Sequence, residues 1–309
     1  MHMEEKFFPP MIVEKPRNEQ KENQEKFIET LNQVSQIESL SGQEEKMRQY
    51  IETELEKIGI QSERDVKGNV WVHSSNPEGE ILLCAHMDKV GNGCPVENSG
   101  SRIKGRLDDA FGISAILEIL KNGKRPSVLF TVEEESETEI ENENGEIRMK
   151  MRDLSETGFN AGANFAVGRI EKGEVRKPKM VVNVDVSAKS NIGDGPLIYQ
   201  SCTPFGTNTF RFPSGALKDV VKIVNRNEMG AKVLHGGAND AIEFTFAKNV
   251  GVVTVQVPVE NMHSTNEIAD LGDIKKAIDI IELILDKHDE IKEEKEIPTH
   301  AIKNDAINL

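Results

Sequence analysis

Four short apolar runs lie along the chain, at residues 81–85, 127–132, 180–184 and 251–257. They are rich in β-branched residues and nearly continuous, which is typical of strands that are covered on both faces. The segments between them are long enough to hold helical crossovers. The sequence therefore predicts an α/β fold, a three-layer α/β/α sandwich around a mostly parallel mixed sheet.

Three helices are predicted from apolar residues that recur at helical spacing. The first opens at Ser41, which forms a capping box with Glu44, and it ends at Gly59. The second follows Ser214, and the third begins near Asp273.

This pattern occupies residues 21–292, which we expect to form a single domain of the 309-residue chain. Residues 1–20 combine three prolines with charges and few apolar side chains, so we expect an N-terminal arm there. Residues 293–309 are expected to form a polar tail.

One acidic insertion interrupts the domain directly after the second apolar run. It carries Asn144 followed by Gly145, a strong two-residue turn signal, with apolar residues alternating behind it. The pattern predicts a β-hairpin over residues 137–151, with a disordered acidic loop as the alternative.

Acidic residues outnumber basic ones, with 53 Asp and Glu against 38 Lys and Arg and a formal net charge of −15. This excess argues against nucleic acid or an anionic membrane as a partner, because both require a positive protein face. The chain has three cysteines and no CxxC pair, and no apolar stretch reaches the length of a membrane span. We therefore expect a cytoplasmic protein without a disulfide framework.

Histidines and carboxylates follow the four apolar runs. They are His86 and Asp88 after the first run, Glu133, Glu134 and Glu135 after the second, Asp185 after the third, His263 a few residues beyond the fourth, and Asp108 and Asp109 at the start of an apolar helix. Because the carboxyl ends of parallel strands meet at one edge of a sheet, we expect these side chains to lie close together. Such a cluster repels itself unless a cation neutralises it.

The ligand types narrow the choice of cation. Imidazole and carboxylate without thiolate suit Zn²⁺, with Co²⁺ or Mn²⁺ as alternatives. Two histidines and at least three carboxylates exceed what one tetrahedral ion needs, and they suit two ions that share a carboxylate. The spacing of His86 and Asp88 lets the aspartate accept the other ring N–H of the histidine and fix its tautomer.

Several segments resemble, in the same order, the motifs of the co-catalytic dizinc aminopeptidases and related exopeptidases. The segments are AHMDKVG, GRLDDAFGISAILEIL, LFTVEEE, VVNVDVS with GDGPLI, and NMHSTNEIADLGDI. The later ones are most similar to the tetrahedral (glutamyl/deblocking) aminopeptidase family, and the stretch from residue 86 to 109 resembles the tripeptidase branch. The resemblance implies a phosphorylase/hydrolase-like catalytic domain that removes N-terminal residues from short peptides through a two-metal-activated water.

The resemblance also implies a role for each motif residue. His86 and Asp185 would hold one ion, Glu135 and His263 would hold the other, and Asp108 would bridge the two. Glu134 would be the general base, and Asp88 would orient the ligand His86. Asp109 would follow a cis peptide bond. The family spacing Thr-x-x-Glu-Glu, counted from Thr131, implies Glu134 and Glu135 as the active pair. Without that spacing, the triplet leaves the pair Glu133 and Glu134 equally open.

The chain departs from these relatives in its accessory domains. Only 22 positions separate His86 from Asp108, where the tetrahedral family inserts a large assembly domain. Only 78 positions separate Asp185 from His263, where the tripeptidase branch inserts a lid. We therefore expect a bare catalytic domain that is a monomer or a small homo-oligomer.

Two local departures concern the site. The glycine-containing turn that follows the family's Glu-Glu pair is absent after Glu135, and GFNAGANF at residues 158–165 is its expected displaced continuation. The segment HGGANDA replaces the family's Gly-Gly-Thr-Asp-Ala run, which leaves the role of Asp240 open.

Two alternatives to an aminopeptidase stay open. A carboxypeptidase, dipeptidase or N-acyl-amino-acid amidohydrolase on the same scaffold needs a cation for the substrate carboxylate, and Arg102, Lys104 or Arg106 could supply it. A non-catalytic metal-binding homologue is the second alternative, although all the expected ligands and the base are present.

Overall fold

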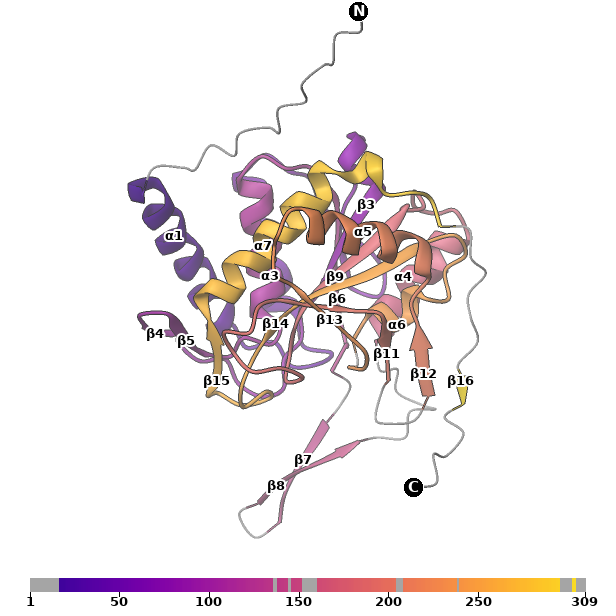
Figure 1. Ribbon diagram of the computed structural model, residues 1–309. Coiled ribbons are helices and arrows are strands. Elements are labelled where there is room, and N and C mark those ends of the chain that lie inside the picture. Colours follow the sequence, from indigo (N-terminus) through magenta and orange to yellow (C-terminus); the bar gives the residue numbers. More distant parts are fainter. Residues whose placement is uncertain are drawn as a thin grey trace, which may run out of the picture.

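The computed structural model describes residues 17–135, 138–143, 146–151, 160–203, 208–237, 239–294 and 302–303. A central sheet of eight strands runs through the molecule in the order β1-β2-β6-β3-β9-β14-β10-β13 (Figure 1). The strands are β1 (Glu63–Arg64), β2 (Val70–Val72), β3 (Ile81–His86), β6 (Ser127–Thr131), β9 (Met180–Ser187), β10 (Leu197–Tyr199), β13 (Lys232–Leu234) and β14 (Gly251–Pro258). The four predicted apolar runs are β3, β6, β9 and β14. They are mutually parallel neighbours at the centre of the sheet.

Helices cover both faces of this sheet, as the sequence predicts. They are α1 (Arg17–Gln36), α2 (Glu45–Lys57), α3 (Ala110–Lys121), α4 (Ala161–Glu171), α5 (Ser214–Arg226), α6 (Ala241–Phe244) and α7 (Leu271–Asp286). Helices α3, α5 and α7 pack on β3, β9 and β14, and α7 also contacts α3 and α5. Helix α6 packs on β9 and β14, and α4 packs on α6. Every residue of β3, β9 and β14 is buried, which explains why their sequences are mostly apolar.

Short 3-10 turns and smaller sheets complete the described structure. The turns are η1 (Pro77–Glu80) and η3 (His288–Glu290). One three-stranded sheet consists of β4 (Glu97–Ser99), β5 (Arg102–Gly105) and β15 (Glu267–Asp270), and another consists of β11 (Ser201–Cys202), β12 (Asn208–Arg211) and β16 (Ile302–Lys303). A two-stranded sheet consists of β7 (Thr138–Glu143) and β8 (Glu146–Met151). In the last of these, β7 and β8 pair antiparallel from Thr138↔Met151 to Glu143↔Glu146 and project away from the sandwich (Figure 1). The expected turn residues Asn144 and Gly145 lie outside the described residues.

The first predicted helix has the expected end but not the expected start. Gly59 follows α2 with φ +72°, the left-handed conformation of a helix-terminating glycine. The capping-box prediction is wrong, because α2 begins at Glu45 and no side chain caps it. Ser41 instead donates its hydroxyl hydrogen to Asp88 Oδ2 at 2.5 Å. The side chain that was expected to cap the helix thus makes a long-range hydrogen bond.

Helix α1 was not predicted and overlaps the expected arm. Its sequence is mostly polar, and Phe27, Leu31 and Val34 are the buried apolar residues that attach it to the core. The helix begins at Arg17, so the last four residues of the segment 1–20 are helical, and the rest of that segment lies outside the described residues. No helix in the described part of the chain has both the length and the apolar character needed to cross a membrane.

Candidate metal centre

The predicted histidines and carboxylates come together at the carboxyl ends of the central strands. In the described part of the chain, three overlapping groups have ligand-type atoms within 4.8 Å of one another. The groups are His86 with Asp108 and Asp185, His86 with Glu134 and Glu135, and Asp108 with Glu135 and His263. All six residues belong to the set selected from the sequence.

Asp108 lies at the centre of the cluster, between the two histidines. Its Oδ1 is 3.1 Å from His86 Nε2, and its Oδ2 is 3.3 Å from His263 Nε2. Asp185 Oδ1 lies 3.8 Å from His86 Nε2 on one side, and Glu135 Oε2 lies 3.5 Å from His263 Nε2 on the other. The geometry therefore consists of two half-sites that share one carboxylate.

The electrostatics of the cluster are those of a site that needs positive charge. Burial raises the pKa of Glu135 well above its usual range, and the neighbouring Asp108 raises it further. Burial also raises the pKa of Asp185. Burial opposes ionisation of Asp108 too, but the adjacent imidazoles of His263 and His86 outweigh it and lower the pKa of Asp108. Asp108 Oδ2 and Glu135 Oε1 are buried and make no hydrogen bond within the described residues. These orphaned oxygens fit a cation, because buried polar atoms otherwise have partners.

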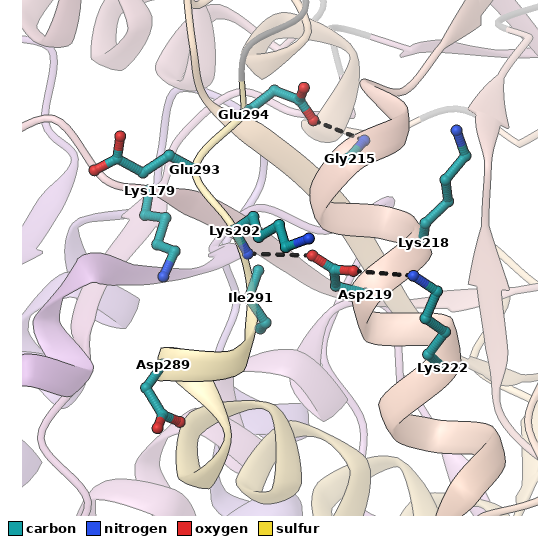
Figure 2. A pocket seen from close by; sticks show the side chains of 10 residues that line it. All are labelled: Lys179, Gly215, Lys218, Asp219, Lys222, Asp289, Ile291, Lys292, Glu293 and Glu294. Atoms are coloured by element: carbon teal, nitrogen blue, oxygen red, sulfur yellow. Dashed lines mark hydrogen bonds and ion pairs between the residues drawn. The ribbon is translucent and has the colours of Figure 1, made fainter.

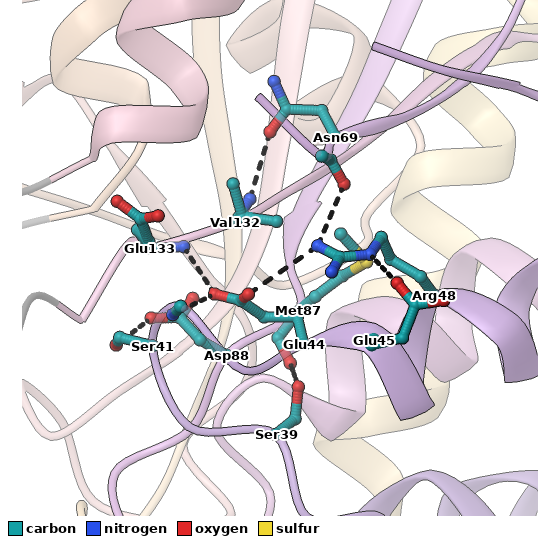
Figure 3. Close-up of polar contacts among 12 residues, drawn as sticks. Ser39, Ser41, Glu44, Glu45, Arg48, Asn69, Met87, Asp88, Val132 and Glu133 are labelled. Carbon is teal, nitrogen blue, oxygen red and sulfur yellow. Dashed lines mark hydrogen bonds and ion pairs between the residues drawn. The ribbon is translucent and has the colours of Figure 1, made fainter. Parts of the chain in front are cut away.

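Asp88 holds the turn that carries the glutamate triplet, Glu133 to Glu135. Its buried carboxylate accepts hydrogen bonds from the backbone N–H groups of Glu134 at 3.0 Å and Glu135 at 2.9 Å. It also accepts one from Ser41 Oγ, which Figure 3 shows. His86 Nδ1 lies closer to the Asp88 backbone oxygen, at 3.0 Å, than to its carboxylate Oδ1, at 3.4 Å. Asp88 thus orients the histidine mainly through its main chain and the turn through its side chain.

The three glutamates of the triplet have different surroundings. Glu133 has φ +54°, its carboxylate pairs with Lys67 Nζ at 2.7 Å, and its N–H donates to the buried Glu44 (Figure 3). Glu134 and Glu135 instead face the cluster. Burial raises the pKa of Glu134 well above its usual range, and the carboxylate of Glu135 raises it further against the opposing effect of His86.

The chain returns to the triplet after the acidic insertion, as expected for the displaced segment 158–165. Asn160 N–H donates to the carbonyl of Glu134, and Gly162 N–H donates to the carbonyl of Val132. A Cβ at residue 162 would lie 2.5 Å from Asn69 Oδ1, so this close approach requires glycine. Gly158 and Phe159 lie outside the described residues.

The two aspartates of uncertain function occupy distinct positions. The Asp108–Asp109 peptide bond is cis, as the resemblance implies, and Asp109 Oδ1 accepts the Gly112 N–H at the start of α3. Asp240 lies beneath the cluster, where Oδ2 accepts a hydrogen bond from Thr131 Oγ1 and burial raises the pKa of the carboxyl to about 7. It belongs to none of the three ligand groups.

Sequence reasoning missed Ser41, Glu44 and Glu267, which contact the site from distant segments. Glu267 is fully buried, and it accepts backbone hydrogen bonds from both Asp108 and His263. Burial, followed by the charge of Asp108, raises the pKa of Glu267 to about 7. The one available signal was its place in the strand-like stretch after His263, where a charged residue at a buried position is unusual.

A groove of about 680 Å³ lies elsewhere, between the start of β9, helix α5 and the segment after α7 (Figure 2). Lys179, which lines it, directly precedes β9, so the groove is at the opposite end of that strand from Asp185. The protein itself engages two of the acidic groups that line it: Asp219 Oδ1 lies 3.4 Å from Lys222 Nζ, and Glu294 accepts the Gly215 N–H. None of the predicted site residues lines this groove.

Comparisons with known proteins agree with the fold. The sequence profile described as peptidase family M28 matches residues 69–271, a span that holds the whole cluster. An aminopeptidase from the archaeon Desulfurococcus kamchatkensis is similar in structure, with a TM-score of 0.68 at 16% identity over 87% of this chain and 97% of the other. The Pyrococcus horikoshii TET1 peptidase, described as assembling into a tetrahedron or a large octahedral shell, gives 0.63 at 20% identity over 84% and 99%. An aminopeptidase from Bacillus cereus gives 0.60 at 12% identity over 85% and 98%.

Proposed function

The chain belongs to peptidase family M28 and is a peptide hydrolase, and we propose that it is a dinuclear metallo-aminopeptidase that removes N-terminal residues from short peptides. The family membership confirms the resemblance to metallopeptidases that the sequence motifs suggest. The finer activity, the number of ions and the role of each residue are our proposal.

One observation carries this proposal, namely the position of Asp108 between two sets of ligands. His86 and Asp185 would hold one divalent ion, Glu135 and His263 would hold the other, and Asp108 would bridge them. Imidazole and carboxylate donors fit zinc first, with cobalt or manganese as alternatives. When bound, two such ions supply Lewis-acid activation of a water and of the scissile carbonyl.

Glu134 is the proposed general base. It lies in the same group of ligand-type atoms as His86 and Glu135, yet neither half-site needs it for completion. Its carboxylate accepts the proton of the attacking water and later donates it to the leaving amine. A pKa raised by burial suits a group that must exchange protons near neutral pH.

The carboxylate-recognising alternatives receive less support from the geometry. Lys104 Nζ lies 3.4 Å from the Glu97 carboxylate, and the buried Arg106 lies 3.9 Å from Glu267 Oε1. Lys104 is thus engaged with an acidic group of the protein itself, whereas Nε and Nη1 of the buried Arg106 make no hydrogen bond within the described residues. The acidic cluster favours a substrate with a free α-amino group over one that presents a carboxylate. The three free cysteines in the described structure also fit the cytoplasmic, reducing environment that we propose.

The test is product analysis on matched short peptides with free and with blocked N-termini, using protein loaded with Zn²⁺, Co²⁺ or Mn²⁺. We expect sequential loss of N-terminal residues from the free peptides only. Glu134→Gln should abolish most of this activity, and Glu133→Gln is the matched control that should keep it.

Three outcomes would contradict the proposal. Release of C-terminal residues would favour a carboxypeptidase, and cleavage of acylated amino acids would favour an amidohydrolase. Protein that retains metal but hydrolyses none of these substrates would favour a non-catalytic homologue.

A further inference from the structure

Glu267 connects two loops that are far apart in the sequence. It is the first residue of β15, and β15 pairs antiparallel with β5, opposite Gly105. Its Oε1 accepts the backbone N–H of His263 at 2.7 Å. Its Oε2 accepts the backbone N–H of Asp108 at 3.0 Å and that of Leu107. One carboxylate thus ties the loop after β5 to the loop before β15.

Neither loop is held in place by the central sheet at these residues. Asp108 lies between β5 and α3, and His263 lies between β14 and β15 with φ +64°. This left-handed conformation is unfavourable for a residue with a side chain and persists only when neighbouring contacts stabilise it. The hydrogen bond from the His263 N–H to Glu267 is such a contact.

A purely structural role for Glu267 is hard to reconcile with its burial. The side chain is fully buried, and the nearest cationic group is Arg106 Nη1, 3.9 Å from Oε1. A buried carboxylate with a single distant counter-charge is a poor source of stability compared with an apolar side chain of similar size. Its value lies in accepting N–H groups from both sides at once, which a neutral side chain does less well.

We propose that Glu267 is a positioning residue for the metal ion of the Glu135 and His263 half-site, called the second ion below, because it sets the separation of Asp108 and His263. This inference rests on the proposed function. His86 is paired with Thr131 of β6, and Asp185 is paired with Gln256 of β14, so the central sheet holds both independently of Glu267. Loss of Glu267 should therefore weaken the half-site of Glu135 and His263 more than that of His86 and Asp185, which shares only Asp108 with it.

The experiment is a stepwise Zn²⁺ titration of the full chain against a competing chromophoric chelator, with circular dichroism to monitor folding. In Glu267→Gln, the amide oxygen can accept from one loop only, and the amide NH₂ faces donors on the other. We expect the affinity for the ion at Glu135 and His263 to fall by about 10- to 100-fold, as for other residues that orient metal ligands, and the affinity for the ion at His86 and Asp185 to fall much less.

Asp273 provides a matched control. It is also a buried carboxylate that accepts two backbone N–H groups, from Gly193 at 2.6 Å and Gly195 at 3.0 Å. It belongs to none of the ligand groups. Asp273→Asn should leave both zinc affinities unchanged, even if it lowers the melting temperature. Glu267→Asp keeps the charge with a shorter reach, and its expected second-ion affinity is intermediate; it replaces Glu267→Gln if that variant does not fold.

The outcomes separate this inference from the function on which it rests. If the wild-type chain binds two ions and the Glu267 variants bind the second as tightly, the positioning role is wrong. Equal weakening of both ions would overturn it too, because a general structural defect would then explain the effect. A wild-type chain that binds a single ion would overturn the proposed dinuclear site itself, and this inference with it.

Discussion

Replacement of Asp88 by asparagine tests whether the turn of the glutamate triplet is held by one carboxylate. Asp88 Oδ1 accepts from the Glu134 N–H, and Oδ2 accepts from the Glu135 N–H and the Ser41 hydroxyl. Asparagine has one carbonyl oxygen, so its NH₂ group must face at least one of these donors. Each buried donor left without an acceptor costs about 1–3 kcal/mol. We therefore expect Asp88→Asn to lower the free energy of unfolding of the metal-free protein by about 1–3 kcal/mol or more.

The assay is urea unfolding in the presence of a chelator, together with zinc titration of the folded protein. Because Glu135 belongs to the disturbed turn, zinc affinity should fall by about 10- to 100-fold. Ser41→Ala removes one of the three donors and should cost about 1 kcal/mol. The double variant should lose less than the sum of the single losses, because the two residues share a hydrogen bond. An Asp88→Asn protein with wild-type stability and zinc affinity would refute the reasoning.

Three further predictions follow from the site. Glu135→Ala should lower occupancy of the ion at Glu135 and His263, with activity partly restored by excess metal. Glu134→Gln should keep both ions and lose about 10²–10⁴-fold in kcat. An inactive Glu133→Gln that retains its metal, beside an active Glu135→Ala, would instead make Glu133 the base and Glu134 the ligand. The pKa of Asp240 is raised from 3.8 to about 7 by burial. Its folded state therefore binds a proton more tightly than its unfolded state, and the metal-free protein should lose up to about 4 kcal/mol of stability as pH rises from about 4 to 7. Urea unfolding should show a weaker decline for Asp240→Asn, and an unchanged pH profile would contradict this. Light scattering should give the mass of a monomer or a small oligomer. A mass near twelve chains, the number in the dodecamer of the TET1 peptidase, would contradict this prediction and show that the chain has an assembly surface without an inserted assembly domain.

The elements that could be predicted are those whose signal is local. Strands β3, β9 and β14 are buried along their whole length, so their sequences are mostly apolar. The end of α2 needs a left-handed residue and has Gly59. Helix α1 could not be predicted because its buried stripe of apolar residues is too narrow within a mostly polar segment.

The site was predictable as far as strand ends determine it. His86 is the last residue of β3, Asp185 lies near the end of β9, and the glutamate triplet follows β6, so their meeting at one edge follows from the parallel topology. The contacts that hold these groups depend instead on tertiary structure. Ser41 has a side chain suited to capping, and only the folded chain brings it to Asp88, 47 residues away. Likewise, Glu267 contacts Asp108 across 159 residues, which no local pattern encodes.

Anomalous diffraction at the zinc edge, from crystals of the zinc-loaded protein, tests the central claim most directly. The account predicts two peaks that flank Asp108, one beside His86 and Asp185 and the other beside Glu135 and His263. A single peak, or peaks away from Asp108, would contradict the dinuclear site.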